Sequence, residues 1–237
     1  AHAAKLDVRD RASFAAFLDD TRAALGPIDV LVNNAGIMPM GPFLDEPLAL
    51  SDAQIDINFR GVIHGMQLAL PEMLARGSGH IVNIASLAGR FGIPGAVVYT
   101  GTKFAVVGLT EAADAEYRGR GVHFTAVMPS KVRTELASGT EEAGKGIPAV
   151  GPEDVAAAVV QALRRPQLFV AVPFYLKPAA GLLQLVPEWL TRLGRRALGD
   201  GRILSKLDHG SRAAYERRIG ALAQPAPVAA RKAARRG

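Results

Sequence analysis

The sequence predicts an α/β fold in which helices pack on a parallel sheet, and three observations favour this class. Short apolar runs of strand length alternate along the chain with amphipathic runs of helix length. Several apolar runs end in polar residues, which is typical of strands whose carboxyl ends share one functional edge. The chain has 237 residues, 49% of them hydrophobic, so it is long enough for one sizeable core and short for two domains.

The expected elements follow one another in βαβ order. Residues 11–25 carry apolar side chains on one side, and Gly26-Pro27 ends this expected helix. The apolar run at 28–32 predicts a buried strand, and the long periodic stretch 51–76 predicts one helix. The later elements expected are a strand at 80–86, a helix at 99–118, a strand at 122–130, a helix at 153–163 and a strand at 167–172.

The charge and composition of the C-terminal end differ from those of the rest. We expect residues 1–220 to form a single domain and residues 221–237, rich in Ala, Pro and Arg, to be a disordered tail. Of the net charge of +6, residues 192–237 carry +9 and the rest of the chain −3. No aromatic stacking platform or known binding module accompanies the basic tail, so we expect no nucleic-acid partner.

The stretch 173–198 is strongly apolar but is interrupted by Lys177, Glu188 and three prolines. It cannot supply the ~20 apolar residues of a transmembrane helix, and we expect an apolar substrate lid or a subunit interface. Trp189 beside three arginines favours an alternative, a weak contact with an anionic membrane surface. Residues 131–150, rich in glycine, are expected to form a mobile loop over the site.

The chain contains no cysteine and no pair of histidines at the spacing of a zinc site. Disulfides are therefore excluded, and no metal site is expected. The lack of cysteine suits the cytosol, and the first residues lack the apolar core of a signal peptide. We expect a cytoplasmic protein that can touch a membrane surface. His64, His80 and His123 have no catalytic partners in the pattern and are expected to be structural.

Ser86, Tyr99 and Lys103 form the pattern S-x12-Y-x3-K, which joins a hydroxyl, a phenol and a cation. A free tyrosine has a pKa of about 10, and a nearby positive charge stabilises the phenolate and lowers that value. In a helix the side chains at i and i+4 share a face, so the Lys103 ammonium is expected beside the Tyr99 phenol. The pattern predicts a proton-transfer site for carbonyl chemistry.

Other polar residues are expected to gather at the same edge of the sheet. Asn33-Asn34-Ala35-Gly36 ends the first apolar run, Asn58 lies within the long helical stretch, and Pro129-Ser130 ends the third apolar run. Each has a structural alternative. Ser86 can cap a strand end, Asn58 can satisfy a nearby backbone group, and Asn33 can belong to an Asx turn.

In their order along the chain these motifs resemble those of the short-chain dehydrogenase/reductase family. The matching residues are Asp7-Val8, Asn33-Asn34-Ala35-Gly36, Asn58, Ser86, Tyr99-x3-Lys103 and Pro129-Ser130-Lys131-Val132-Arg133-Thr134. The resemblance implies a doubly wound, Rossmann-like parallel sheet, NAD or NADP as cofactor, and hydride transfer between that cofactor and an alcohol or ketone. Members of the family commonly form dimers or tetramers, so a homo-oligomer is expected.

The resemblance also implies a role for each matching residue. Tyr99 would act as general acid or base, Lys103 would lower its pKa and bind the nicotinamide ribose, and Ser86 would hold the substrate oxygen. Asn58 would belong to a water relay from Lys103 to solvent. The cofactor-binding residues implied are Asp7, Val8, Asn33, Ala35, Gly36, Tyr99, Lys103, Pro129, Ser130, Val132 and Thr134.

Two departures from the family pattern bear on function. No glycine-rich turn of the G-x-x-x-G-x-G kind is present. We therefore expect an N-terminally truncated sheet without its first βαβ unit, roughly 30 or more residues. Ser130 stands where the family usually has glycine. The missing turn favours an alternative, a non-catalytic or cofactor-deficient homologue that acts as a binding or oligomer partner.

The substrate expected is an apolar alcohol or ketone, because the stretch 173–198 offers hydrocarbon rather than convergent charge. Sugar epimerases and dehydratases share Tyr-x3-Lys on the same scaffold, and they remain a rival reaction class. They generally carry a larger C-terminal substrate region, so hydride transfer at a carbonyl fits the pattern best.

Overall fold

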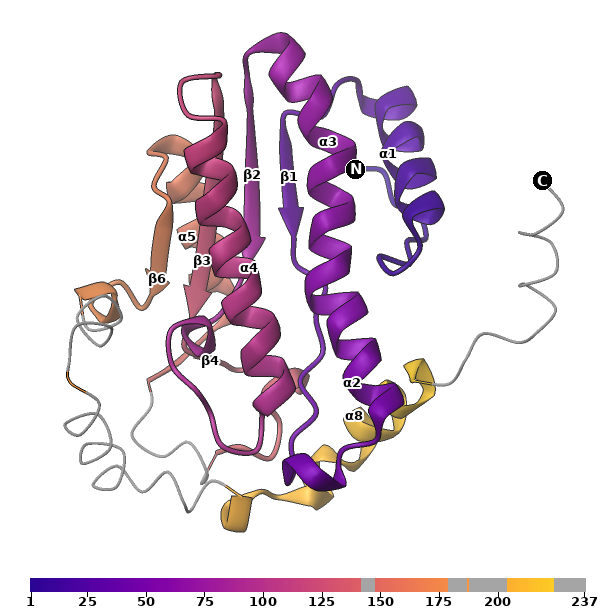
Figure 1. Cartoon of the computed structure of the whole chain (residues 1–237), viewed down its shortest axis with the longest axis vertical. Helices are drawn as coiled ribbons and strands as arrows, with labels where there is room; N and C mark the ends of the chain where they lie inside the picture. The colour runs from indigo at the N-terminus through magenta and orange to yellow at the C-terminus, as the bar shows by residue number, and fades with distance from the viewer. Residues whose placement is uncertain (142–147, 179–186, 188–203, 224–237) are drawn as a thin grey trace, which may run out of the picture.

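A computed structural model of the protein describes residues 1–141, 148–178, 187 and 204–223. Its centre is a four-stranded parallel sheet with the strand order β1-β2-β3-β6 (Figure 1). This architecture confirms the α/β class expected from the sequence. The strands are β1 (Val30–Asn33), β2 (Gly79–Ile84), β3 (Val122–Pro129) and β6 (Phe169–Val172).

Helices cover both faces of the sheet. In Figure 1, α3 and α4 lie in front of the strands, α5 lies behind them, and α1 lies beside α3. The sheet is therefore wound on both sides. The helices are α1 (Arg11–Leu25), α3 (Gly61–Arg76), α4 (Val97–Glu116) and α5 (Pro152–Arg164), and the short 3-10 turns are η1 (Phe43–Asp45), η3 (Leu87–Gly89), η4 (Glu135–Ala137) and η6 (Leu204–Lys206).

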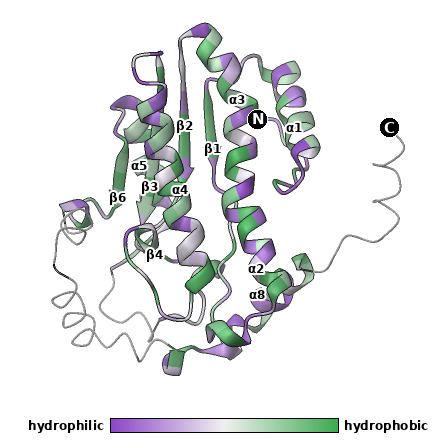
Figure 2. Ribbon diagram, in the orientation of Figure 1, coloured by the Kyte–Doolittle hydropathy of each residue, from purple (hydrophilic) through white to green (hydrophobic). Residues whose placement is uncertain are grey.

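The central strands form the core because both of their faces are covered. Ile81 packs into the cluster under α3 and α4, whereas Val82 and Val127 pack into the cluster under α5. Such two-sided burial requires nearly continuous apolar strands, and Figure 2 shows the strands in the green of hydrophobic residues. At the edge strand β1 the pattern alternates, so that Leu31 is buried and Val32 is exposed.

The expected helix at 11–25 is confirmed at both ends as α1. The Asp10 carboxylate accepts a hydrogen bond from the Ala12 amide at 2.8 Å, which supplies the N-cap. Phe14 and Leu18 are buried against the core. Gly26 ends the helix with a φ of +91°, a conformation that suits glycine.

The expectation of one helix over 51–76 is wrong in detail. The structure has α2 (Leu48–Ile55), a π-helical turn η2 (Asp56–Arg60) and then α3. A π turn widens the helix by one residue and breaks the regular hydrogen-bond ladder, and such turns frequently occur at functional sites. Here the turn carries Asn58, whose side chain is bound on the inner side of the helix.

The remaining predictions differ from the structure mostly at boundaries. The strand expected at 80–86 ends at Ile84, and the helix expected at 99–118 begins at Val97. The loop expected at 131–150 starts with β4 (Lys131–Val132) and ends with β5 (Ala149–Val150), which pair in parallel. Residues 142–147 of that loop lie outside the described residues.

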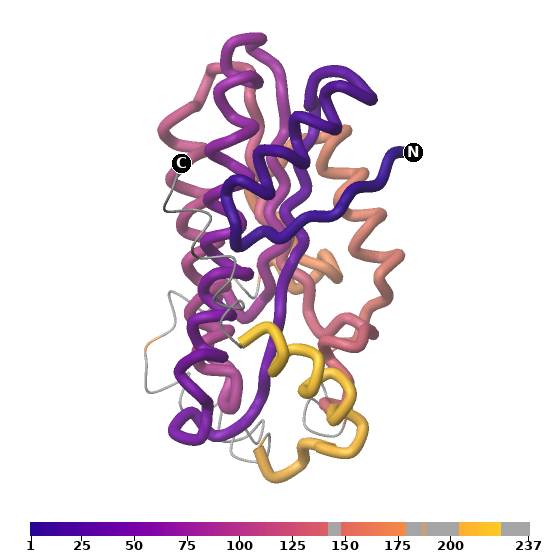
Figure 3. Tube along the Cα trace, turned by 90° about the vertical axis from the view of Figure 1, so that its right-hand side faces the viewer, coloured from indigo at the N-terminus to yellow at the C-terminus, as the bar shows by residue number. Residues whose placement is uncertain are grey.

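One further helix, α8 (His209–Leu222), is not expected from the sequence. Figure 3 shows it, in yellow, crossing the segment that follows β1. Of the stretch 173–198 only 173–178 and 187 are described, so the predicted lid or membrane contact around Trp189 lies outside the described residues, as do residues 224–237 of the predicted tail. Within the described residues, no helix combines the length and apolar character of a bilayer span.

Candidate active site

A cavity of about 890 Å³ opens at the carboxyl ends of β1, β2 and β3. The residues that follow each of these strands line it, together with the first turns of α4 and one side of α5. In a parallel α/β sheet this is the edge where ligands bind. Predicted site residues from four segments meet here, namely Gly36, Ser86, Tyr99, Lys103, Pro129 and Thr134.

Tyr99 and Lys103 stand one turn apart on α4, as the pattern predicts. Both are buried, with 6% and 5% of their surfaces exposed. The Lys103 ammonium lies 5.6 Å from the centroid of the Tyr99 ring. It also donates a hydrogen bond to the carbonyl oxygen of Ile84 at 2.8 Å, which anchors it to the end of β2.

Burial dominates the acidities of this pair. It raises the pKa of Tyr99 to about 12, and a hydrogen bond with the Ser86 side chain offsets only part of that rise. It also lowers the pKa of Lys103 to about 8, because a buried ammonium loses hydration. The expectation that Lys103 brings the Tyr99 pKa below its usual value is therefore wrong for this structure.

Ser86 lies two residues beyond the end of β2 and has a structural and a site-facing contact. Its hydroxyl oxygen accepts a hydrogen bond from the Ala88 amide at 3.1 Å and so caps the turn η3. The same hydroxyl donates to the Pro129 carbonyl at 3.4 Å at the edge of the cavity, and the Ser86 side chain contributes to lowering the Tyr99 pKa. The sequence offered these two interpretations as alternatives, and both contacts occur together.

Asn58 holds the segment that follows β1. Its Oδ1 accepts from the Ile37 amide at 2.8 Å, and its Nδ2 donates to the Ile37 carbonyl at 2.9 Å and to the Thr102 hydroxyl at 3.2 Å. The side chain is fully buried. These bonds occupy the amide group, and the water relay implied for Asn58 stays a prediction.

The segment after β3 forms a second wall of the cavity. Pro129, Ser130, Val132 and Thr134 all line it, as does Lys131. The Ser130 hydroxyl, at the position where glycine was expected, donates to the Pro148 carbonyl at 2.7 Å. That bond ties the two ends of the loop 131–150 together while leaving the Ser130 backbone at the cavity.

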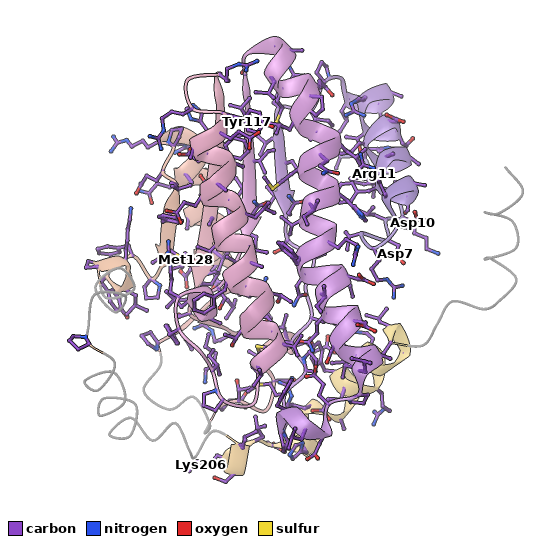
Figure 4. The ribbon with its side chains drawn as sticks, viewed as in Figure 1. Asp7, Asp10, Arg11, Tyr117, Met128 and Lys206 are labelled. Carbon is purple, nitrogen blue, oxygen red and sulfur yellow. The ribbon has the colours of Figure 1, made fainter. Side chains whose placement is uncertain are left out.

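Three of the predicted cofactor-binding residues do not line the cavity. The Asp7 carboxylate is bound by the Arg9 guanidinium at 2.8 Å, which contributes most to lowering the Asp7 pKa. The Val8 carbonyl bonds to a ring nitrogen of His64 at 3.0 Å. Asn33 donates to the buried Asn83 side chain at 2.8 Å. Figure 4 shows Asp7 on the α1 side of the molecule, near Asp10 and Arg11. Cofactor contact by these residues stays a prediction.

Several lining residues were not predicted from the sequence. The segment after Gly36 contributes Met38 and Met40. Their position directly after the Asn-Asn-Ala-Gly run was a usable signal, since residues after a strand end reach the edge of the sheet. The other unpredicted lining residues include Phe91, Ile93, Leu136, Val155 and Val159.

Known proteins match this chain over most of its length. The family model described as short chain dehydrogenase matches residues 1–145. The oxidoreductase UcpA of Escherichia coli is 44% identical over 132 residues, which are 55% of this chain and 50% of UcpA. The ketoacyl reductase HetN of a Nostoc species is 37% identical over 160 residues, 67% of this chain and 56% of HetN. The chain thus spans about half the length of these two relatives.

A solved structure has the same fold. It is a gluconate 5-dehydrogenase from Burkholderia cenocepacia in complex with NADP and tartrate, which aligns with a TM-score of 0.64 at 26% identity over 70% of this chain and 71% of that one. The family model covers more than half of the chain and includes the Tyr99 and Lys103 pair. The protein belongs to the short-chain dehydrogenase family.

Proposed function

We propose that the protein is an NAD(P)-dependent oxidoreductase that transfers a hydride between a nicotinamide cofactor and the carbonyl or alcohol carbon of an apolar substrate. Tyr99 is the general acid and base. One observation carries the proposal: the buried Tyr99 phenol and the buried Lys103 ammonium lie side by side in the lining of the large cavity, which the Ser86 side chain also lines. Membership of the family supports the same chemistry.

The cavity wall suits the flat nicotinamide end of such a cofactor. A side chain at Gly36 would occupy the space beside Lys103, since its Cβ would lie 3.8 Å from the ammonium and 3.4 Å from Asn58 Oδ1. Glycine keeps that space open. Tyr99 and Lys103 would hold the ribose, and the backbone from Pro129 to Thr134 would meet the carboxamide. When bound, the reduced cofactor supplies the hydride.

The protonation states support reduction of a carbonyl near neutral pH. With a pKa of about 12, Tyr99 is a phenol at pH 7 and can donate its proton to the substrate oxygen. Lys103, with a pKa of about 8, is mostly charged at that pH and can stabilise the phenolate left behind. In the oxidation direction Tyr99 must first lose its proton, so alkaline conditions favour it.

The lining of the cavity supports an apolar substrate. Met38, Met40 and Ile93 pack beside Tyr99 and line the cavity, as does Phe91, and no carboxylate of the described residues lines it. Burying a hydrocarbon chain against such a wall stabilises the complex by about 25 cal/mol per Å² of apolar surface removed from water. A medium-chain ketone or lipid-like aldehyde fits better than a sugar, which would leave many hydroxyls without partners.

Titration with NADH and with NADPH, followed by fluorescence, tests cofactor binding directly. Reduction of 2-octanone under saturating cofactor then tests the chemistry. We expect binding of one or both cofactors and turnover of the ketone. Failure to bind either cofactor favours the alternative, a cofactor-deficient homologue that acts as a binding partner. Binding with turnover of polar sugars alone would contradict the apolar substrate.

We further propose that the protein is cytoplasmic and forms a homo-oligomer. The outer face of α4 exposes Val97 and Phe104, two apolar side chains that a second copy would cover. Light scattering after size exclusion measures the mass, and a dimer or tetramer is expected. Substitution of Phe104 by Asp should shift the protein toward a monomer.

A further inference from the structure

We propose that Arg212 is a positioning residue that ties the segment after β1 to the segment after β3 and thereby fixes the substrate side of the cavity. It lies on α8, beyond residues 1–145 of the family match. The two segments it joins are 36–40 and 135–140, which contribute Met38, Leu136 and Thr140 to the lining. The effect on substrates rests on the proposed function, whereas the structural tie does not.

The Arg212 guanidinium is fully buried and directs its donors to main-chain oxygens of both segments. One terminal nitrogen donates to Met38 O at 2.7 Å, and the other donates to Ser138 O at 2.6 Å and Leu136 O at 3.3 Å. Its Nε bonds to Glu216 on the same helix at 3.3 Å. Arginine suits this position because its planar fork presents several donors in fixed directions.

Tyr215, one turn along α8, completes the contact with the first segment. Its hydroxyl accepts a hydrogen bond from the Met38 amide at 2.8 Å, so α8 binds both main-chain groups of Met38. Asn58 binds both main-chain groups of the preceding residue, Ile37, from the other side. Two consecutive residues of this segment, of which Met38 lines the cavity, are thus held by side chains from two helices that lie far apart in the sequence.

The second segment is shaped to receive α8. Gly139 has a φ of +69°, and a Cβ there would overlap the carbonyl oxygen of Asp208 and lie 2.6 Å from Arg212 Cγ. The Gly139 carbonyl accepts from the Asp208 amide at 3.0 Å, directly at the start of the helix. The buried charge would be costly without these partners. The burial therefore requires both segments to stay in place.

Hydrogen exchange followed by mass spectrometry tests the tie without cofactor or substrate. We compare Arg212→Met with Arg218→Met as the matched control. Arg218 also lies on α8 and near the Tyr215 ring, but its side chain is 62% exposed and pairs with Glu135. In Arg212→Met we expect exchange in 36–40 and in 135–140 to rise about tenfold or more, as loss of buried hydrogen bonds implies, with β2 and β3 unchanged. Arg212→Lys should restore part of the protection. Exchange equal to that of Arg218→Met would overturn the proposal.

Tyr215→Phe provides a second test that remains valid if Arg212→Met unfolds the whole protein. The phenylalanine keeps the packing of the ring and removes only the acceptor for the Met38 amide. We expect faster exchange confined to 36–40, by about tenfold. Unchanged exchange there would overturn the proposal even if Arg212→Met unfolds.

Kinetics test the consequence for substrates. For Arg212→Met we expect KM for 2-octanone to rise about tenfold while kcat and the KM for 2-butanone stay within about twofold, because only the longer chain reaches the loosened wall. A uniform fall in kcat, or an unchanged KM for 2-octanone, would contradict the role in positioning. Absence of turnover in the unsubstituted protein would count against the proposed function. The hydrogen-exchange result alone would then test whether Arg212 joins the two segments.

Discussion

Asn58 and Ile37 are joined by two hydrogen bonds, one from the Ile37 amide at 2.8 Å and one to the Ile37 carbonyl at 2.9 Å. This pairing connects the π-helical turn to the segment after β1. It holds the residue next to Gly36, and a Cβ at Gly36 would lie 3.8 Å from the Lys103 ammonium. A side chain that is expected to act in a relay therefore also builds the wall of the site.

Asn58→Ala should destabilise the protein by about 3 kcal/mol, because two buried main-chain groups lose their partners at about 1–3 kcal/mol each. Urea unfolding measures the change. Gln67→Ala provides a control, since Gln67 accepts one exposed hydrogen bond from Arg11 on a neighbouring helix and should cost under about 0.5 kcal/mol. Equal unfolding midpoints for the two variants would contradict the role given to Asn58.

Tyr99→Phe should lower kcat by about 10²–10⁴-fold, the usual contribution of a general acid. Affinity for the cofactor should change little, because the ring and its packing remain. Lys103→Ala should reduce both kcat and the affinity for the cofactor, since the ammonium lies beside the phenol and is proposed to hold the ribose. Steady-state kinetics and fluorescence titration separate the two effects. Equal turnover in the phenylalanine variant would remove Tyr99 from the chemistry.

Lys103→Met should also change how stability depends on pH. The pKa of Lys103 is about 8 in the folded protein and near 10.5 in the unfolded chain. Between these values the unfolded chain binds more protons, so the stability contributed by this residue rises from pH 8 to pH 10. The methionine variant should lack this rise. Urea midpoints of both proteins at pH 7, 8, 9 and 10 give the comparison, and parallel curves would contradict the lowered pKa.

The sequence predicted the parts of the site that depend on strand ends and on helical spacing. Tyr99, Lys103 and Ser86 meet at the expected edge because periodicity determines which residues share a helix face and where a buried run stops. Four of the strands and four of the helices appear near their expected positions for the same reason. Spacing of this kind is local, so these positions can be predicted without knowledge of tertiary contacts.

The residues that the sequence analysis missed depend on contacts between distant segments. In the π turn the Asn58 side chain bonds to Ile37, 21 residues earlier in the chain, and no local pattern contains this pairing. Helix α8 carries an arginine at its most buried position, which a hydropathy pattern assigns to solvent. The Tyr99 pKa follows from burial by the whole cavity wall, so the adjacent lysine alone gave the wrong direction.

His80→Gln should make the protein more resistant to mild acid. Burial lowers the His80 pKa to about 4, and the nearby His123 adds to this effect. Between pH 6.5 and pH 4 the unfolded chain therefore binds more protons, and stability falls as the pH falls. The Thr125 hydroxyl donates to Gln167 O, so the His80 ring donates to Thr125, as a glutamine amide can. Thermal unfolding at pH 7 and pH 5 measures the difference, with exposed His209→Gln as control. If the Tm fell by the same amount between pH 7 and pH 5 in His80→Gln and in the unsubstituted protein, that result would contradict a neutral, buried His80.

Gly119 and Gly121 offer a matched pair for the turn that leads into β3. Both have a φ of +78°, so alanine at either position costs about 1–2 kcal/mol of backbone strain. A Cβ at Gly119 would meet no atom within 4 Å, whereas one at Gly121 would overlap the carbonyl oxygen of Gly77, the residue that ends α3. These two turns pack together because β2 and β3 begin side by side, with Gly79 opposite Val122.

Gly121→Ala should therefore cost about 3 kcal/mol or more, the strain plus the overpacking of backbone against backbone, and Gly119→Ala only about 1–2 kcal/mol. Urea unfolding of the two variants gives the difference directly. Because the strain is common to both, the excess for Gly121 measures the contact between the turns alone. Equal midpoints would show that the chain relieves the overlap at no cost, and the close approach of the two turns would then not set the register of β2 and β3.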